Sequence, residues 1–244
     1  MDDQMYHAFY RVESTHWWFI VRKNIIIEFL KKTLKDENDT TILDIGCGTG
    51  FILESLRKFG NAHGIDTHRD AIAYTNRRLR DENASTLHNI LSDVLSKKYS
   101  LITFFDVIEH IENDDLFLQK IKGGLKKDGT ICLTVPAYQK LWSPHDEINH
   151  HFRRYNKKQI IEKLTKAGFN IQKITYFNTL LFLPAVLQKI YMRFITKKAQ
   201  ADTTPPVVIN TIFRFIFSLE KYILKIFNLP FGLSIFVIAK PKDL

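Results

Sequence analysis

The residues in this sequence that are best suited to chemistry form a glycine-rich turn within ILDIGCGTGF, residues 42–51. Gly46, Gly48 and Gly50 follow a short apolar run, so we expect the carboxyl end of a strand to turn there into a helix. Uncovered backbone amides and the helix N-terminus would then face a ligand lying over the edge of the sheet. The turn predicts a corner that binds a nucleotide.

Asp44, two residues before the first glycine, narrows the choice of ligand. A dinucleotide fingerprint favours a small residue where this sequence has Phe51, and it does not normally carry an acid at the position of Asp44. A carboxylate repels a pyrophosphate and attracts a cation. Asp44 therefore favours a ligand with a cationic end, such as the ammonium and sulfonium groups of S-adenosylmethionine.

Carboxylates also follow at the expected ends of the next two strands. Asp66 is placed to accept hydrogen bonds from both hydroxyls of a ribose. Asp93 is placed to accept one from the exocyclic amine of an adenine. The ordered set predicts a nucleoside site, although each acid could instead cap the helix that follows it, Asp93 in particular.

The elements that would position these residues alternate along the chain. Strands are expected near residues 41–45, 62–66, 85–91, 100–107, 129–136, 170–177 and 233–241, and helices near 14–35, 50–59, 69–82, 114–126 and 157–169. Strands alternating with helices at this spacing predict an α/β fold with a mostly parallel sheet and helices on both faces. Between residues 137 and 156 we expect an aromatic and histidine-rich loop.

The chain resembles class I S-adenosylmethionine-dependent methyltransferases in the order and spacing of LDIGCGTG, GID, SDV, FFDVIEHI, GGLKKDGTICLTVP and KAGF. The resemblance covers about residues 40–175 and the final strand. It implies a Rossmann-like sheet of seven strands in the order 3-2-1-4-5-7-6, the last strand being antiparallel. The residues to which it assigns contacts with the cofactor, S-adenosylmethionine, are Asp44, Gly46, Gly48, Gly50, Asp66, Thr67, Asp93, Val94 and Asp106.

The N-terminal stretch HWWFIVR and the later stretch LWSPHDEINHHFRRY are similar to a bacterial subgroup of the same superfamily. By that similarity Trp18 and Arg22 fold over the cofactor, and Arg22 pairs with its carboxylate. Plain packing of the helix is the alternative for the tryptophans.

An oxygen acceptor for the methyl group must also lose a proton. The candidate bases are His110, just after Asp106, and three histidines of the loop that follows the fifth strand: His145, His150 and His151. A structural role is the alternative for each of them.

Neither a metal ion nor a nucleic-acid partner is expected. Asp106, Glu109 and His110 resemble a motif of quinone O-methyltransferases in which a magnesium ion is implied. A helix would splay Glu109 and His110, so we assign no metal site. The motif of amino-methylating DNA enzymes is missing after FFDVIEHI, so we expect no nucleic-acid partner despite the net charge of +9.

Residues 177–232 depart from the alternation of strands and helices. They carry seven basic residues against two acidic ones, which is +5 of the net +9. We expect amphipathic helices at 179–196 and 207–227, with basic rows formed by Lys189, Arg193 and Lys197 on the first and by Arg214, Lys221 and Lys225 on the second. This pattern suits a lid or an element lying on an anionic membrane surface. A homodimer contact or a cover for the sheet is the alternative.

The length and composition of the chain limit how many domains it can form. A chain of 244 residues that is 45% apolar can bury one α/β core with an elaboration. We divide it into an N-terminal helical cap (1–39), a core (40–176 and 233–244) and the insertion (177–232). Cys47 and Cys132 lack metal-ligand spacing, and the first residues do not resemble a secretory signal, so we expect a cytoplasmic protein, peripheral on the inner membrane face if it meets one.

These inferences predict a methyltransferase that acts on oxygen of a small-molecule, lipid-linked or isoprenoid acceptor. The alternative is a non-catalytic membrane- or partner-binding protein on the same scaffold.

Overall fold

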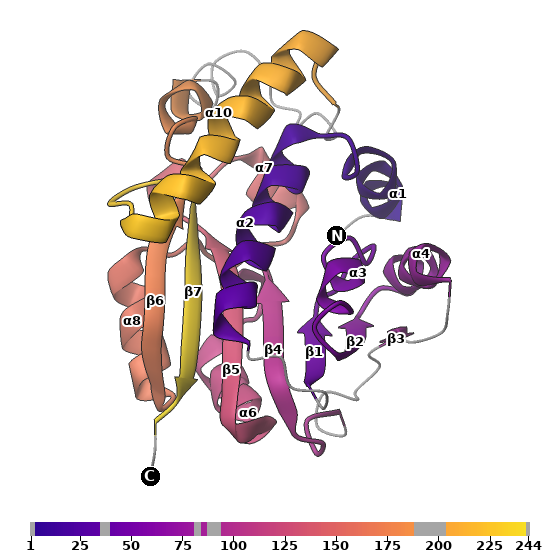
Figure 1. The fold of residues 1–244 in the computed structure, drawn as a ribbon, viewed down its shortest axis with the longest axis vertical. Helices are drawn as coiled ribbons and strands as arrows, with labels where there is room; N and C mark the ends of the chain where they lie inside the picture. Colours follow the sequence, from indigo (N-terminus) through magenta and orange to yellow (C-terminus); the bar gives the residue numbers. More distant parts are fainter. Residues whose placement is uncertain (1–2, 35–39, 81–83, 87–93, 188–203, 243–244) are drawn as a thin grey trace.

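The computed structural model describes residues 3–34, 40–80, 84–86, 94–187 and 204–242. Seven strands form one sheet in the order β3-β2-β1-β4-β5-β7-β6 (Figure 1). The strands are β1 Thr41–Ile45, β2 Asn61–Asp66, β3 Ala84–Thr86, β4 Tyr99–Phe105, β5 Leu125–Pro136, β6 Phe169–Phe177 and β7 Ser234–Pro241. All pairs are parallel except those of β7, which runs antiparallel to β5 and β6. The predicted fold class, strand order and antiparallel last strand are confirmed.

The helices described are α1 Asp3–Val12, α2 Trp17–Thr33, α3 Leu53–Leu56, α4 Arg69–Leu79, α6 Asp114–Gly123, α7 Pro144–Ile148, α8 Lys157–Lys166 and α10 Val207–Ile226, with 3₁₀ turns η1 Ile108–His110 and η2 Gln139–Leu141. Gly168, just after α8, has φ 83°, as expected of a glycine that ends a helix. The predicted strand at 85–91 and the basic row of Lys189, Arg193 and Lys197 fall largely or wholly outside the described residues.

Two expectations about helices were wrong. In addition, α1 was not among the individual helices expected, although residues 1–39 were expected to form a helical cap. The helix expected at 50–59 is only α3, because the amides of Lys58 and Phe59 bond to carbonyls three residues back and tighten its last turn. The stretch expected to be a loop after β5 contains α7, which begins with a capping box between Ser143 and Asp146.

Alternation along the central strands builds a core on each face of the sheet. In β5, Ile131, Leu133 and Val135 pack on one face, while Cys132 between them packs on the other. Residues of α6 and α8 complete the first core, and residues of α2, α3, α4 and α10 complete the second. The site at the sheet edge therefore rests on a frame that is buried from both sides.

Helix α2 is apolar on two sides because it lies between the sheet and α10 (Figure 1). Its Phe29 ring lies 5.0 Å from that of Phe236 in β7, and its Trp17 ring lies 5.7 Å from that of Phe217 in α10. Lys225 of α10 forms an ion pair with Glu28 of α2 at 2.6 Å. None of the described helices is long and apolar enough to cross a membrane.

Candidate active site

The glycine turn follows β1 directly, at the end of the sheet where the parallel strands finish and near which α1 and α7 lie (Figure 1). The amides of Gly46 and Cys47 donate to the carbonyl of Ile65 at 2.8 and 3.1 Å. Gly46 has φ 69°, and a Cβ there would lie 2.5 Å from a methyl group of Val107. Gly48 has φ 57° and nothing within 4 Å of where its Cβ would be. Only glycine suits Gly46, and the turn presents bare backbone to a ligand.

Asp66 joins this turn to the end of β2. Its two carboxylate oxygens accept hydrogen bonds from the amides of Gly48 at 3.0 Å and His68 at 2.9 Å. Burial raises the pKa of Asp66, and these backbone amides lower it. The carboxylate is fixed in place while still lining a cavity, beside Thr67.

Asp44 lies in β1, one residue before the carboxyl end of the strand, and its side chain is buried, with only 2% of the residue exposed. The Thr103 hydroxyl donates a hydrogen bond to it at 2.6 Å. Burial raises the pKa of Asp44 to about 7, so at neutral pH its carboxyl is divided between the protonated and ionised forms. A cation bound nearby would favour the ionised form, which is the form of Asp44 expected to attract the cationic end of the ligand.

Arg22 reaches from α2 to the ends of β4 and β5. One of its terminal nitrogens lies 2.6 Å from the Asp106 carboxylate and donates to the Thr134 hydroxyl at 2.8 Å. The guanidinium carbon lies 4.8 Å from the centre of the Trp18 ring. The Nε of Arg22 is buried and has no hydrogen-bond partner. It is a donor suited to a ligand carboxylate, and the predicted pairing of Arg22 with one stays a prediction.

Glu13, between α1 and α2, is a site residue that sequence reasoning missed. It is 4% exposed, accepts a hydrogen bond from the Thr49 hydroxyl at 2.6 Å and forms an ion pair with Arg78. Burial raises the pKa of Glu13, and Thr49 and Arg78 lower it. Glu13 thereby fastens the N-terminal helices to the glycine turn. No periodicity or motif marks it in the sequence.

A cavity of about 1230 Å³ runs along these elements. Of the predicted residues, those that line it are Trp18, Arg22, Asp44, Gly46, Gly48, Asp66, Thr67, Asp106, His110, His145, His150 and His151. Gly50 is turned toward Thr75 instead, and Val94 packs against the core, so neither lines the cavity. Asp93 lies outside the described residues.

His110, His145, His150 and His151 line the part of the cavity that we call the histidine end. The rings of His110 and His151 meet edge to face, with centroids 4.5 Å apart. Burial, together with the neighbouring His151, lowers the pKa of His110 to about 4. His151 is held by Asp146 at 2.9 Å. His145 and His150 are exposed at the rim.

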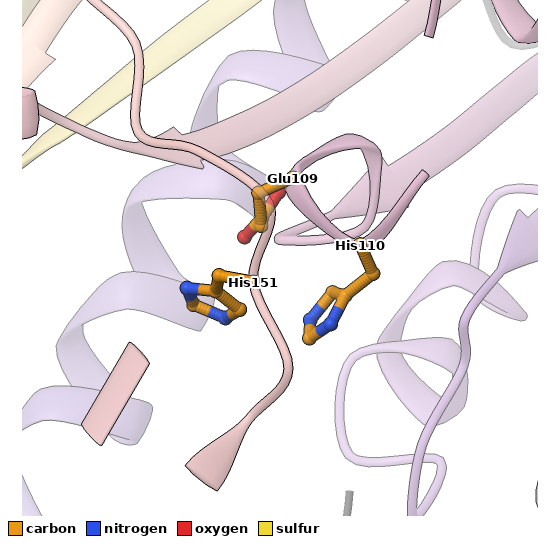
Figure 2. Close-up of side chains that lie close together, drawn as sticks. All are labelled: Glu109, His110 and His151. Atoms are coloured by element: carbon orange, nitrogen blue, oxygen red, sulfur yellow. The ribbon is translucent and has the colours of Figure 1, made fainter. Parts of the chain in front are cut away.

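Glu109 lies beside these rings (Figure 2). It is 0% exposed, and neither of its carboxylate oxygens has a hydrogen-bond partner. Burial raises the pKa of Glu109, and the Asp106 charge adds to the effect. The expectation that Glu109 and His110 splay too far apart to share a ligand was wrong, because one ligand atom of each lies within 4.8 Å of the other and of His151, which comes from the loop after α7.

Comparison with known proteins agrees with this geometry. A family model described as "methyltransferase domain" matches residues 19–174, more than half of the chain. A ubiquinone biosynthesis O-methyltransferase of Rickettsia bellii is 34% identical over 176 residues, covering 63% of this chain and 71% of that protein. N-methyltransferase 4 of Papaver somniferum is 33% identical over 116 residues, covering 44% of this chain and 33% of that protein. The chain thus spans about a third of the length of the Papaver protein.

Solved structures share the fold. An S-adenosylmethionine-dependent methyltransferase from Clostridium acetobutylicum superposes with a TM-score of 0.58 at 15% identity, covering 91% of each chain. Phosphoethanolamine N-methyltransferase 2 from Haemonchus contortus, in complex with S-adenosyl-L-methionine, gives 0.57 at 19% identity, covering 90% of this chain and 53% of that one.

The residues present fit this cofactor. A buried carboxyl at Asp44 can face its cationic end, Asp66 can accept from the ribose, and the unpartnered Nε of Arg22 can donate to its carboxylate. The chain therefore belongs to the methyltransferase-domain family, as an enzyme that uses S-adenosylmethionine.

Proposed function

We propose that the enzyme transfers the methyl group to a hydroxyl oxygen of an apolar, lipid-linked or isoprenoid acceptor. One observation carries the proposal: a single cavity of about 1230 Å³ includes both the glycine corner and the histidine end. A pocket for one drug-sized ligand measures about 300–1,000 Å³. The cavity is large enough for the cofactor and an acceptor together.

S-adenosylmethionine supplies an electrophilic methyl group when bound. In this proposal the chain's own residues bind and orient. Asp66 holds the ribose, while Arg22 and Asp106 lie at the methionine end. Trp18 and Phe19 line the cavity from α2 and help to exclude water. Positioning of this kind supplies much of the rate enhancement of a displacement reaction.

The histidine end would receive the acceptor. His110 is a weak proton acceptor because its pKa is about 4, so it is neutral at physiological pH. His151 has the more strongly oriented ring, since Asp146 holds its Nδ1. Phe152, 53% exposed, lines the cavity beside them and offers an apolar surface for a greasy acceptor.

Helix α10 supports a lipid-linked acceptor. Its exposed face carries an apolar stripe at spacings of four and three: Val208, Ile212, Phe215, Leu219, Tyr222 and Ile226. The predicted basic residues Arg214, Lys221 and Lys225 each precede a residue of this stripe, and Lys225 is also paired with Glu28 of α2. An apolar stripe flanked by basic residues suits the surface of an anionic membrane. A contact between two copies of the chain is the second candidate for this face.

The decisive experiment is transfer of a labelled methyl group. Purified enzyme is incubated with labelled cofactor and either lipid or water-soluble extracts, and mass spectrometry identifies the methylated atom. Label in a lipid hydroxyl is expected. Label confined to water-soluble amines would contradict the proposal. Asp66→Ala should weaken binding of S-adenosylhomocysteine in calorimetry, whereas the exposed Asp70→Ala, with the same change of charge, should not.

A further inference from the structure

The structure assembles a different set of side chains from the one that the sequence resemblance associates with magnesium. That set was Asp106, Glu109 and His110. Asp106 is engaged by Arg22 at 2.6 Å and by the Thr134 hydroxyl at 3.0 Å. Among the residues that the structure describes, the ligand atoms that gather within 4.8 Å of one another belong to Glu109, His110 and His151.

Glu109 lacks the partners that a buried carboxyl needs. It is fully buried, and both of its oxygens are without a hydrogen bond. A buried polar group left without a hydrogen bond destabilises the folded protein. Figure 2 shows the Glu109 carboxyl on the same side as the two imidazole rings. A positive group bound between the three side chains would satisfy it.

Each imidazole is held through one nitrogen by the chain itself. The Nδ1 of His151 bonds to Asp146 at 2.9 Å, and the His110 ring bonds to the backbone of Asn149. Asp146 is fully buried and fixed in turn by Arg154, at 2.7 and 3.0 Å. Histidines that bind metal ions typically have their second nitrogen held by a carboxylate or a backbone carbonyl in this way.

We propose that Glu109, His110 and His151 bind a divalent transition-metal ion of the zinc type at the acceptor end of the cavity. Two imidazoles and one carboxylate suit Zn²⁺, Co²⁺ or Fe²⁺, whereas Mg²⁺ prefers oxygen ligands. The bond lengths in such sites, about 2.0–2.2 Å, require these atoms to approach one another by roughly an ångström. Rotation of the side chains can supply that movement.

The role of the ion rests on the proposed function. Three protein ligands leave coordination positions open toward the cavity, as in catalytic rather than structural sites. An ion at such a site lowers the pKa of a coordinated hydroxyl. An acceptor hydroxyl would then lose its proton to solvent water more readily than beside His110 alone, and its oxygen would form the bond to the methyl carbon as the sulfur–carbon bond of the cofactor breaks.

Metal binding is tested directly on the full chain, stripped with a chelator and dialysed. Calorimetry with Zn²⁺ should show one ion per chain, and Co²⁺ should give the visible absorption of a nitrogen- and oxygen-ligated site. Mg²⁺ in large excess should not displace either. Glu109→Gln and His151→Ala should each weaken Zn²⁺ binding at least tenfold. Asp146→Asn should weaken it about 10- to 100-fold, through His151.

Two matched variants serve as controls. Glu112→Gln removes an exposed carboxylate three residues from Glu109, and His63→Ala removes a histidine of β2 outside the cavity. Both should keep the affinity of the original protein. Circular dichroism melts of every stripped variant establish that each is folded.

Two results would overturn the metal site: a folded protein that binds S-adenosylhomocysteine but no Zn²⁺ at one per chain, or Zn²⁺ binding that survives His151→Ala. Methyl transfer by metal-free enzyme, together with either result, would leave the proposed function standing. Conversely, stoichiometric metal binding without transfer to any hydroxyl would leave the site standing and remove the proposed function.

Discussion

Arg22 of α2 and Asp106 at the end of β4 form an ion pair with a nitrogen to oxygen distance of 2.6 Å. The pair is partly shielded from solvent, with side-chain exposures of 9% and 29%. It ties the N-terminal helices to the sheet at the point where the methionine part of the cofactor is expected. A ligand carboxylate arriving there would meet the unpartnered Nε of Arg22.

Arg22→Lys should weaken binding of S-adenosylhomocysteine. Lysine keeps the charge but loses the planar set of donors that lets Arg22 bond to Asp106, to Thr134 and to a ligand at once. Hydrogen bonds to charged groups contribute about 1.5–3 kcal/mol, so we expect a loss of roughly ten- to a hundredfold in affinity. Calorimetry measures it, with the exposed Arg11→Lys as control. Unchanged affinity would mean that Arg22 does not bond to the cofactor.

Asp44 should couple cofactor affinity to pH. Because its pKa is about 7, raised by burial, the affinity for the cationic cofactor should rise from pH 6 to pH 8 as the carboxylate forms. Asp44→Asn should bind the cofactor more weakly, with a nearly flat pH profile. Calorimetry in buffers of different ionisation enthalpy should detect a proton released on binding to the original enzyme only.

The same substitution should stabilise the ligand-free protein. Folding raises the pKa of the Asp44 carboxyl from 3.8 to about 7. The free energy of unfolding therefore falls as the pH rises from 3.8 to about 7, and this carboxyl lowers it no further above that pH. Asp44→Asn removes that loss, so at pH 8 it should be more stable by on the order of 2–4 kcal/mol. Urea melts at pH 5 and pH 8 measure the difference, which should shrink at the lower pH. A variant less stable at pH 8 would contradict the assigned pKa.

Glu13 and Thr49 should act as one unit. Breaking a buried charged cluster by removing one partner costs about 3–5 kcal/mol when the other charge is left unpaired, so Glu13→Gln, which strands Arg78, should lower the free energy of unfolding clearly. Thr49→Val should cost less. Since the two side chains are bonded at 2.6 Å, the double variant should lose less than the sum of the two. Strict additivity in urea melts would show that they do not interact.

The exposed stripe of α10 should govern membrane binding. Phe215→Ser and Ile226→Ser together should reduce co-sedimentation with phosphatidylglycerol vesicles by tenfold or more. These side chains are 66% and 76% exposed, and burying each of them in lipid would contribute about 1.5–3 kcal/mol to binding. Leu116→Ser, which removes an exposed apolar residue of α6, is the control. Equal loss of binding in the control would contradict a special role of α10, and a change from dimer to monomer in light scattering would favour the second candidate for this face.

The sequence by itself determined the frame. The periods of apolar residues predicted the strands, and their alternation with helices, together with the resemblance, predicted the sheet order and the glycine corner between β1 and α3. These features are local, because strand and helix periods and the backbone freedom of glycine can be recognised within ten or twenty residues. Even so, the short α3 and the capped α7 were not predicted, since hydrogen bonds within single turns decided them.

The tertiary structure alone decided which side chains meet. Glu13 bonds to Thr49, thirty-six residues away, and His151 joins Glu109 and His110 from a loop more than forty residues later. No periodic pattern records such pairs, because they depend on how two loops leave a shared sheet edge. The same packing decides that Glu109 is buried without a partner and that Asp44 titrates near neutral pH. Burial is a property of the assembled fold, and it turns common residue types into an active site.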